Sequence, residues 1–137
     1  MLKFKRSMFN FFNAVSERDA KQMNPVTLAF VGDAVYSLYV REKYVLSADF
    51  SAGTLQKLTC GEVSAHGQNA LLERVFPQFT EDELAVFKRG RNAKKPTHSK
   101  SASLAEYNNS TGLEAVFGYL YLTGQYERLN TLLNEGK

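Results

Sequence analysis

The hydrophobic residues of this chain recur every three to four positions, the spacing that places side chains on one face of an α-helix. No stretch shows the strict apolar–polar alternation of a half-buried strand, and no internal repeat is present. The pattern predicts an all-α protein with a single domain over residues 1–137, including an N-terminal helical extension over residues 1–20. The predicted helices, of which the fifth begins at Ser110 or Thr111, cover residues 7–20, 25–46, 54–76, 80–91, 110–122 and 126–133.

Polar residues and prolines indicate where several of these helices begin and end. Asn24 followed by Pro25 is a favoured helix start, and Thr80 with Glu83 three residues later forms a capping box. Two glycines bend or divide the third predicted helix. Residues 93–103 contain a proline, several serines and several basic residues, so a basic loop is expected there.

Two of the predicted helices contain a stretch that is apolar on almost every side and carries one acidic residue. These residues are Asp33 on the second helix and Glu114 on the fifth. Small residues near each acid, Gly32 and Gly118 among them, would allow the two backbones to approach closely. The two carboxylates would then face each other, and a divalent cation would relieve their repulsion.

The second predicted helix also carries a large aromatic residue away from its apolar face. Stepping 100° per residue gives a broad apolar face that comprises Leu28, Val31, Val35, Leu38 and Tyr39. The opposite strip consists of Ala29, Phe30, Asp33, Ser37 and Arg41. Phe30 in such a strip indicates a partner surface. In the simpler alternative, Asp33 is a solvated residue of this strip, and Glu114 pairs with a base or favours its own helix N-terminus.

Composition and charge narrow the class of protein. Of the 137 residues, 44% are hydrophobic and 23% are charged, as in a globular domain. Residues 88–100 hold six of the seventeen Lys and Arg and no acid, which indicates a local anionic partner. One cysteine and two distant histidines argue against a structural zinc site, and the lone Cys60 fits a reducing compartment. No apolar stretch is long enough to cross a membrane, so we expect a cytoplasmic protein without a membrane partner.

The two acid-bearing stretches resemble the ribonuclease III catalytic domain. That family's signature, Leu-Glu-Phe-Leu-Gly-Asp-Ala, corresponds to residues 28–34, with Ala29 in place of the Glu. Its second motif, an Asp followed three residues later by Glu-Ala, corresponds to Thr111 and then Glu114 with Ala115. The resemblance covers residues 22–133. It is closest to the branch called Mini-ribonuclease III, in FKRGRNAK (87–94), Tyr107, Ser110-Thr111 and GYLYL (118–122).

The resemblance implies the ribonuclease III endonuclease fold and a homodimer in which Phe30 enters a socket on the partner. It also implies that Asp33 and Glu114 are catalytic residues that hold Mg²⁺, with Mn²⁺ as the alternative ion. Metal-activated water would then cleave double-stranded RNA and leave 5′-phosphate and 3′-hydroxyl ends. Larger members carry two further acids, at the positions of Ala29 and Thr111, whereas Mini-ribonuclease III enzymes similarly keep only one pair.

Longer relatives carry a C-terminal double-stranded-RNA-binding domain, whereas this chain ends soon after Glu114. RNA would therefore be bound by the domain itself, through phosphates and 2′-hydroxyls. The candidate RNA-binding residues lie in and before the basic loop and are Arg89, Arg91, Asn92, Lys94, Lys95 and Lys100.

The implied physiological substrate is a precursor of large-subunit (23S) ribosomal RNA, in a bacterium or a plastid. Ribosome biogenesis would be the process served, with ribosomal proteins as further candidate partners. The alternative is a non-catalytic double-stranded-RNA-binding or ribosome-associated module on the same fold, which the missing acids at positions 29 and 111 favour. A helical protein adaptor would explain Phe30 but would leave the basic segment unexplained.

Overall fold

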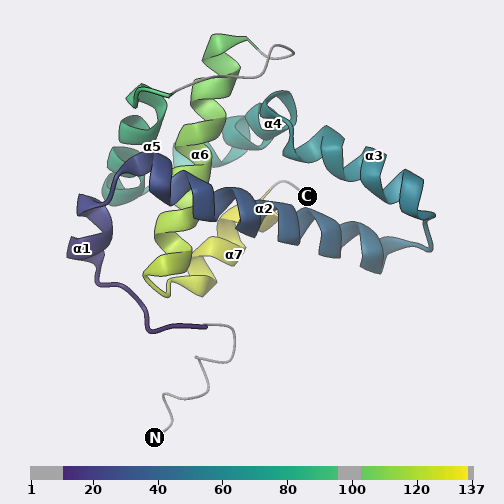
Figure 1. The fold of residues 1–137 in the computed structure, drawn as a ribbon, viewed down its shortest axis with the longest axis horizontal. Coiled ribbons are helices and arrows are strands. Elements are labelled where there is room, and N and C mark those ends of the chain that lie inside the picture. The colour runs from purple at the N-terminus through teal and green to yellow at the C-terminus, as the bar shows by residue number, and fades with distance from the viewer. Residues whose placement is uncertain (1–10, 96–102, 136–137) are drawn as a thin grey trace, which may run out of the picture.

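The computed structural model describes residues 11–95 and 103–135, and within these ranges the chain forms helices, turns and no strand (Figure 1). The helices are α1 (Glu17–Gln22), α2 (Pro25–Ser47), α3 (Ala52–Val63), α4 (Ala65–Val75), the 3₁₀ helix η2 (Phe76–Gln78), α5 (Glu81–Asn92), α6 (Leu104–Leu122) and α7 (Tyr126–Asn134). The all-α class predicted from the hydrophobic spacing is confirmed.

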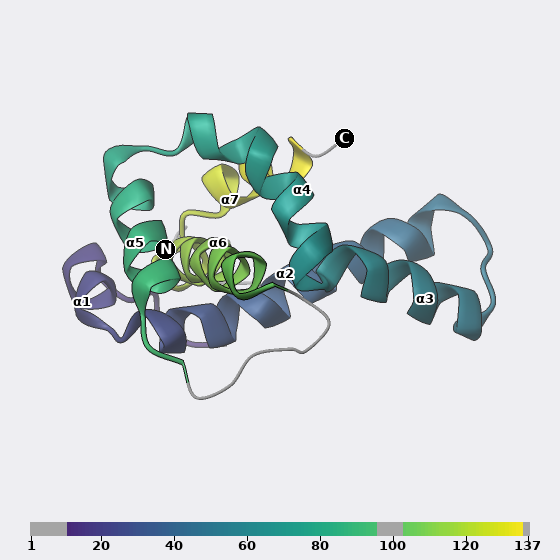
Figure 2. The same cartoon turned by 90° about the horizontal axis from the view of Figure 1, so that it is seen from above.

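Helix α6 occupies the centre of the fold. In Figure 2 it is seen almost end-on, with α5, α7, α4 and α2 arranged around it, while α3 projects to one side. Every residue of α6 from Ser110 to Leu120 is buried except Glu114, which is partly buried. This explains why the α6 sequence is apolar on every side, since neighbouring helices cover all of its faces.

Helices α2 and α6 pack directly backbone on backbone. A Cβ atom added at Gly32 would lie 1.7 Å from the carbonyl oxygen of Glu114, and one added at Gly118 would lie 1.9 Å from that of Leu28. Neither position therefore has room for a side chain. The predicted close approach of the two helices at these small residues is confirmed.

The predicted helix starts at Asn24 and Thr80 are also confirmed. The Asn24 Oδ1 accepts the Val26 N–H at 2.8 Å, and Thr80 and Glu83 form both hydrogen bonds of the capping box. The buried Glu83 carboxylate also accepts two hydrogen bonds from the Arg128 guanidinium, at 2.8 and 2.9 Å. This bidentate pair joins α7 to the start of α5.

The N-terminal helix is shorter than predicted. It begins at Glu17, after the Ser16 side chain has accepted the Asp19 N–H, and residues 11–16 are not helical. The Val15 N–H instead donates to the carbonyl of Leu122 at the end of α6, at 2.8 Å. Residues 1–10, and residues 96–102 of the predicted basic loop, lie outside the described residues.

Two other helix boundaries differ from the predictions. The helix expected over 54–76 divides at Ser64, which ends α3 and caps α4 by accepting the Gly67 N–H at 3.0 Å. The fifth predicted helix begins at Leu104 rather than near Ser110, because Ser103 caps it by accepting the Glu106 N–H at 3.0 Å. The division at Ser64 is set by a local cap, and it lies between Gly61 and Gly67, the two glycines that indicated a bend or division.

The predicted apolar face of α2 was right for Leu28, Val35 and Tyr39, which are buried or pack against the core, and wrong for Leu38. Leu38 is 66% exposed, whereas Ala29 is 5% exposed and both Tyr36 and Val40 are buried. The helix turns its small-residue side toward α6 because Gly32 permits backbone contact there. Leu38, which periodicity assigned to the core, is consequently left on the outer side of α2.

Candidate functional site

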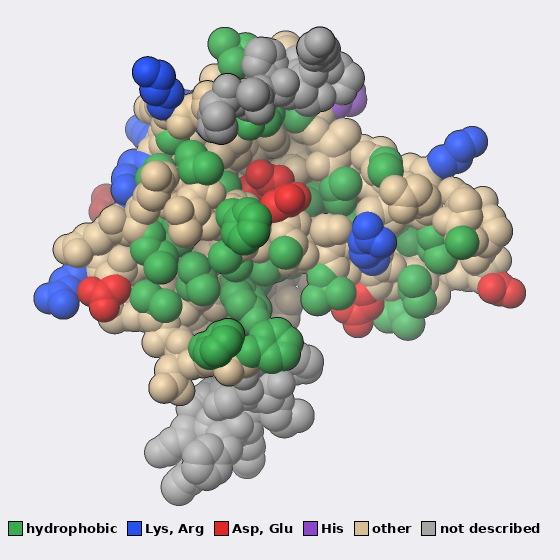
Figure 3. Space-filling model, in the orientation of Figure 1, with side chains coloured by type: hydrophobic (Ala, Val, Ile, Leu, Met, Phe, Trp, Pro, Cys, Tyr) green, Lys and Arg blue, Asp and Glu red, His purple; other side chains and the backbone are tan. Residues whose placement is uncertain are grey.

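Asp33 and Glu114 lie together in one cavity of about 430 Å³. The contact follows from the packing described above, because Gly32 touches the backbone of Glu114 and Asp33 is the next residue on α2. The cavity is also lined by Phe30 and by residues of α2, α3, α4, α6 and the chain after α5, among them Val26, Ala29, Val63, Gln68, Lys95 and Thr111. On the face drawn in Figure 3, acidic side chains gather at the centre beside a hydrophobic side chain.

The electrostatics of the two carboxyls are those of a coupled pair. Burial raises the pKa of Glu114 to about 8, a hydrogen bond from Gln68 lowers it, and the charge of Asp33 and its hydrogen bond with Glu114 raise it further. At neutral pH the pair therefore retains a proton. A divalent cation placed between the two groups would displace that proton.

Gln68 on α4 forms the closest polar support of Glu114. Its side chain is 1% exposed, and its Nε2 donates to Glu114 Oε2 at 2.9 Å and to the Val63 carbonyl at 2.9 Å. Its Oε1 is buried and has no hydrogen-bond partner in the part of the chain that the structure describes. The cavity wall thus contains a carbonyl acceptor with no donor among the described residues.

Positions 29 and 111 contribute no further carboxylate to the cavity. Ala29 and Thr111 are both buried, and the Thr111 hydroxyl donates to the Tyr107 carbonyl at 3.1 Å. Within residues 11–95 and 103–135, no cluster of three or more His, Cys, Asp or Glu could hold a metal ion. Two carboxylates nevertheless fit Mg²⁺, which commonly uses one or two protein carboxylates with water and phosphate oxygens, and the buried Gln68 Oε1 could accept a hydrogen bond from such a water.

The six predicted RNA-binding residues have different surroundings. Lys95 lines the cavity, and its Nζ donates to the carbonyls of Arg91 (3.1 Å) and Ala93 (2.7 Å), so the ammonium is held at the end of α5. Partial burial lowers the pKa of Lys95. Lys94 is exposed, and Lys100 lies outside the described residues.

The other three predicted residues lie on the last turns of α5. Arg89 donates to the carbonyls of Lys21 and Met23, which joins α5 to the turn between α1 and α2. The Arg91 guanidinium lies 5.6 Å from the centre of the Phe87 ring and donates to the Asn92 side chain at 3.2 Å. These arginines thus make contacts within the chain.

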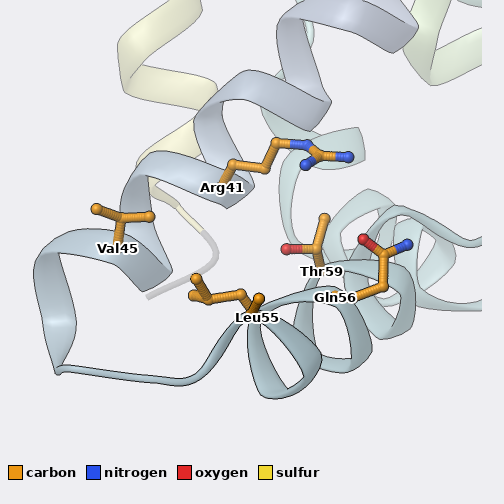
Figure 4. A pocket seen from close by; sticks show the side chains of 6 residues that line it. Arg41, Val45, Leu55, Gln56 and Thr59 are labelled. Carbon is orange, nitrogen blue, oxygen red and sulfur yellow. The ribbon is translucent and has the colours of Figure 1, made fainter.

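Phe30 projects from the cavity and is 81% exposed. Leu38 and Val45 are also exposed further along α2, at steps that keep them near the same side of the helix. Beyond Leu38, a hollow of about 280 Å³ lies between α2 and α3, and Figure 4 shows the side chains around it. Arg41 and Val45 line it from α2, opposite Leu55, Gln56 and Thr59 of α3.

Sequence reasoning missed Gln68. The signal that could have identified it is its position in the apolar row of α4, where Leu71, Leu72 and Val75 follow at three, four and seven residues. A glutamine in such a row must find a buried partner.

None of the helices in the described residues is long and apolar enough to span a membrane.

The chain is similar to known proteins over most of its length. The family model described as Ribonuclease III domain matches residues 26–125. A Mini-ribonuclease 3 of Clostridium tetani is 42% identical over 120 residues, which cover 86% of this chain and 79% of the relative. A Mini-ribonuclease 3 of Symbiobacterium thermophilum is 46% identical over 109 residues, which cover 80% of this chain and 84% of the relative. A Fusobacterium nucleatum protein of known crystal structure aligns with a TM-score of 0.75 and 31% identity, over 82% of this chain and 90% of that chain.

Proposed function

This chain belongs to the ribonuclease III family, and from that membership we propose that it is a divalent-metal-dependent endoribonuclease that hydrolyses double-stranded RNA. The observation that carries the proposal is the meeting of Asp33 and Glu114 in one cavity, from helices far apart in the sequence. The products would have 5′-phosphate and 3′-hydroxyl ends, as the family resemblance implies.

In this proposal Asp33 and Glu114 hold Mg²⁺, or Mn²⁺ as the alternative ion. When bound, a divalent cation polarises the phosphodiester and lowers the pKa of water, which supplies a hydroxide-like nucleophile near neutral pH. The exposed Asp33 faces the RNA, while the partly buried Glu114 is fixed by its backbone contact with Gly32. No side chain is required as a general base, and among the described residues no histidine lines the cavity.

Lys95 has the position of a phosphate-binding residue in the same cavity. Two carbonyls hold its ammonium in place, and its partial burial strengthens the attraction to an anion. The exposed Lys94, together with Arg91, Asn92, Arg89 and Lys100, would bind the RNA backbone more broadly, as expected from the sequence. Phosphate contacts of this kind position a duplex without reading its sequence.

We further propose that two copies associate through the outer side of α2. An isologous two-fold interface pairs residues on either side of its axis. With the exposed Leu38 near that axis, Phe30 of one copy would face the hollow beside Arg41 and Val45 of the other. The arrangement is supported by two features of α2 that lie on opposite sides of Leu38. One is the large exposed aromatic ring of Phe30, and the other is the hollow beside Arg41 and Val45.

The physiological duplex that we propose is a precursor of 23S ribosomal RNA, processed in the cytoplasm during ribosome biogenesis, with ribosomal proteins as candidate partners. This assignment rests on the resemblance to Mini-ribonuclease III, the branch whose name the relatives carry. The exposed, unpaired Cys60 is compatible with a reducing compartment.

The proposal is tested by incubating the protein with long duplex RNA, with and without Mg²⁺, and by analysing the products on a denaturing gel. We expect Mg²⁺-dependent cleavage that Asp33→Asn reduces roughly a thousandfold, because the variant loses one of two metal ligands. RNA binding measured in the absence of metal should remain close to that of the parent.

The matched control is Asp49→Asn, which neutralises an exposed acid in the connection between α2 and α3. It should cleave like the parent. A parent protein that binds duplex RNA but does not cut it under any divalent cation would contradict the enzyme proposal. That result would favour the non-catalytic RNA-binding module, for which Ala29 and Thr111 in place of acids are the supporting observation.

A further inference from the structure

We infer that Gln68 is a positioning residue of the metal centre, whose amide group holds the Glu114 carboxylate in the orientation that binds the cation. This inference rests on the proposed function, in which Asp33 and Glu114 are the metal ligands. It adds a third side chain to the site, one that no sequence motif singled out.

The orientation of the Gln68 amide is fixed by its partners. Both groups near Nε2 are hydrogen-bond acceptors, namely Glu114 Oε2 and the Val63 carbonyl, each at 2.9 Å. Rotating the amide by 180° would place Oε1 against two oxygen atoms. Each N–H of Gln68 is therefore committed, one to the carboxylate and one to the backbone.

This pair of bonds connects Glu114 to the junction of two other helices. Val63 is the last residue of α3, and Ser64 caps α4 directly after it. The Gln68 side chain thus links the carboxylate on α6 to the corner between α3 and α4. With Glu114 Oε2 held by this donor, the carboxyl group keeps one orientation, in which Asp33 is its other polar neighbour.

Gln68 matters more here than it would in a site with four acids. Ala29 and Thr111 cannot ligate as carboxylates, so the site depends on the accurate placement of only two. Groups that hold metal ligands by hydrogen bonds commonly change metal affinity or activity by roughly 10- to 100-fold when they are removed.

The Gln68 carbonyl oxygen distinguishes this role from a purely structural one. A glutamine retained only to fill the core would be expected to have both ends of its amide satisfied. Gln68 Oε1 is buried with no partner in the described residues, on a side chain that lines the cavity of the acidic pair. A loaded site would supply a donor such as an ordered water, which would complete the hydrogen bonding of the amide.

The test compares Gln68→Met with the parent by Mn²⁺ titration, monitored by electron paramagnetic resonance without RNA. Methionine has a similar length and shape but neither donates to Glu114 nor accepts from water. We expect the Mn²⁺ dissociation constant to rise by about tenfold or more. Metal-free RNA binding should change little, whereas the melting temperature of the metal-free protein should fall, because Glu114 and the Val63 carbonyl each lose a buried donor.

The matched control is Gln78→Met in η2, where an exposed glutamine side chain donates only to the Arg74 carbonyl, at 3.2 Å, among the described residues. It should leave the Mn²⁺ affinity unchanged. An equal Mn²⁺ affinity in the parent and in Gln68→Met would overturn the inference. If the parent binds Mn²⁺ but cuts no RNA, the proposed enzyme activity fails while the Mn²⁺ comparison still decides the role of Gln68.

A second measurement uses the unmodified sequence, so it remains decisive if Gln68→Met does not fold. Substoichiometric Mn²⁺ should broaden the side-chain amide NMR signals of Gln68 before those of Gln78, which does not line the cavity, because paramagnetic broadening falls steeply with distance. Mg²⁺ should shift the same Gln68 signals. Gln68 signals that persist as long as those of Gln78 would overturn the inference.

Discussion

At the scale of single residues, Glu114 shows how opposing effects set the protonation of one carboxyl. Burial and the neighbouring Asp33 favour its neutral form, while the hydrogen bond from Gln68 favours the charged form. Burial dominates and raises the pKa to about 8, well above the usual range of a glutamate. The metal-free site is therefore strained at alkaline pH, where both acids must be charged.

This pKa predicts how the stability of the metal-free protein depends on pH. The folded state holds the Glu114 proton more tightly than the unfolded state, so the resulting stabilisation is present at acidic pH. It is lost as the pH rises from the ordinary glutamate range through about 8. We expect calorimetry in EDTA to give a lower melting temperature at about pH 8.5 than at about pH 5.5.

Glu114→Gln should remove part of this pH dependence, whereas Glu73→Gln, at an exposed position of α4, should leave it unchanged. Mg²⁺ should raise the melting temperature of the parent mainly at alkaline pH, because it binds the deprotonated pair. If Glu114→Gln melts with the same pH dependence as the parent, Glu114 does not titrate as described.

The lysines near the site provide a second prediction at this scale. Replacing Lys94, Lys95 and Lys100 by Ala should weaken RNA binding and reduce its salt dependence, by about one unit of slope for each phosphate that the variant no longer neutralises. Lys95→Ala alone should also slow cleavage, because its ammonium lies in the cavity of Asp33 and Glu114. Filter binding and single-turnover cleavage over a range of salt concentrations would measure both effects.

Lys57→Ala is the matched control for these variants, since Lys57 is exposed on α3 and does not line the cavity. Its salt slope should equal that of the parent. A triple variant with an unaltered slope would mean that RNA binds to a different surface.

At the scale of helices, the contact of α2 with α6 depends on two glycines. Gly32→Ala places a Cβ atom 1.7 Å from a backbone oxygen of Glu114, which no side-chain rotation can relieve. The helices would have to separate, so we expect the unfolding free energy to fall by about 3 kcal/mol or more. Urea denaturation followed by circular dichroism would measure it.

Gly61→Ala is a demanding control because it makes the same substitution inside α3, where nothing lies within 4 Å of the added Cβ. It should stabilise the protein by roughly 0.5–1 kcal/mol, through the higher helix propensity of alanine. Equal effects of the two substitutions would contradict the close packing of α2 on α6.

At the scale of the whole molecule, the outer side of α2 is an apolar surface that no other helix of the chain covers among the described residues. Phe30 and Leu38 are 81% and 66% exposed on that side. We expect Phe30→Glu to give monomers in sedimentation velocity, because the variant loses the large aromatic contact and its carboxylate would have to give up water to enter the hollow. Cleavage should fall with the dimer fraction.

Leu104→Glu changes another exposed hydrophobic residue, at the start of α6, and should leave the oligomeric state unaltered. If Phe30→Glu remains dimeric at the same concentration, the interface lies elsewhere. The experiment separates assembly from catalysis, since Asp33→Asn should remain dimeric.

Local signals in the sequence determined much of this architecture. The Asn24 and Thr80 caps, the apolar stretches of α2 and α6, and the pairing of Gly32 with Gly118 all depend on residues that are close in the chain or on side-chain size. The same motifs carried the resemblance to ribonuclease III, which the comparisons confirm. Asp33 and Glu114 could be singled out because an acid in an apolar helix is unusual wherever the helix lies.

Only the tertiary structure decided which side of α2 is buried and what supports Glu114. Periodicity locates an apolar face by side-chain size, but backbone contact at Gly32 turned Ala29 inward and left Leu38 outside. Gln68 meets Glu114 across 46 positions of sequence, so no local pattern predicts the hydrogen bond between them. Local residues specify where helices form, whereas the buried face and the polar partners depend on which other helices pack against them.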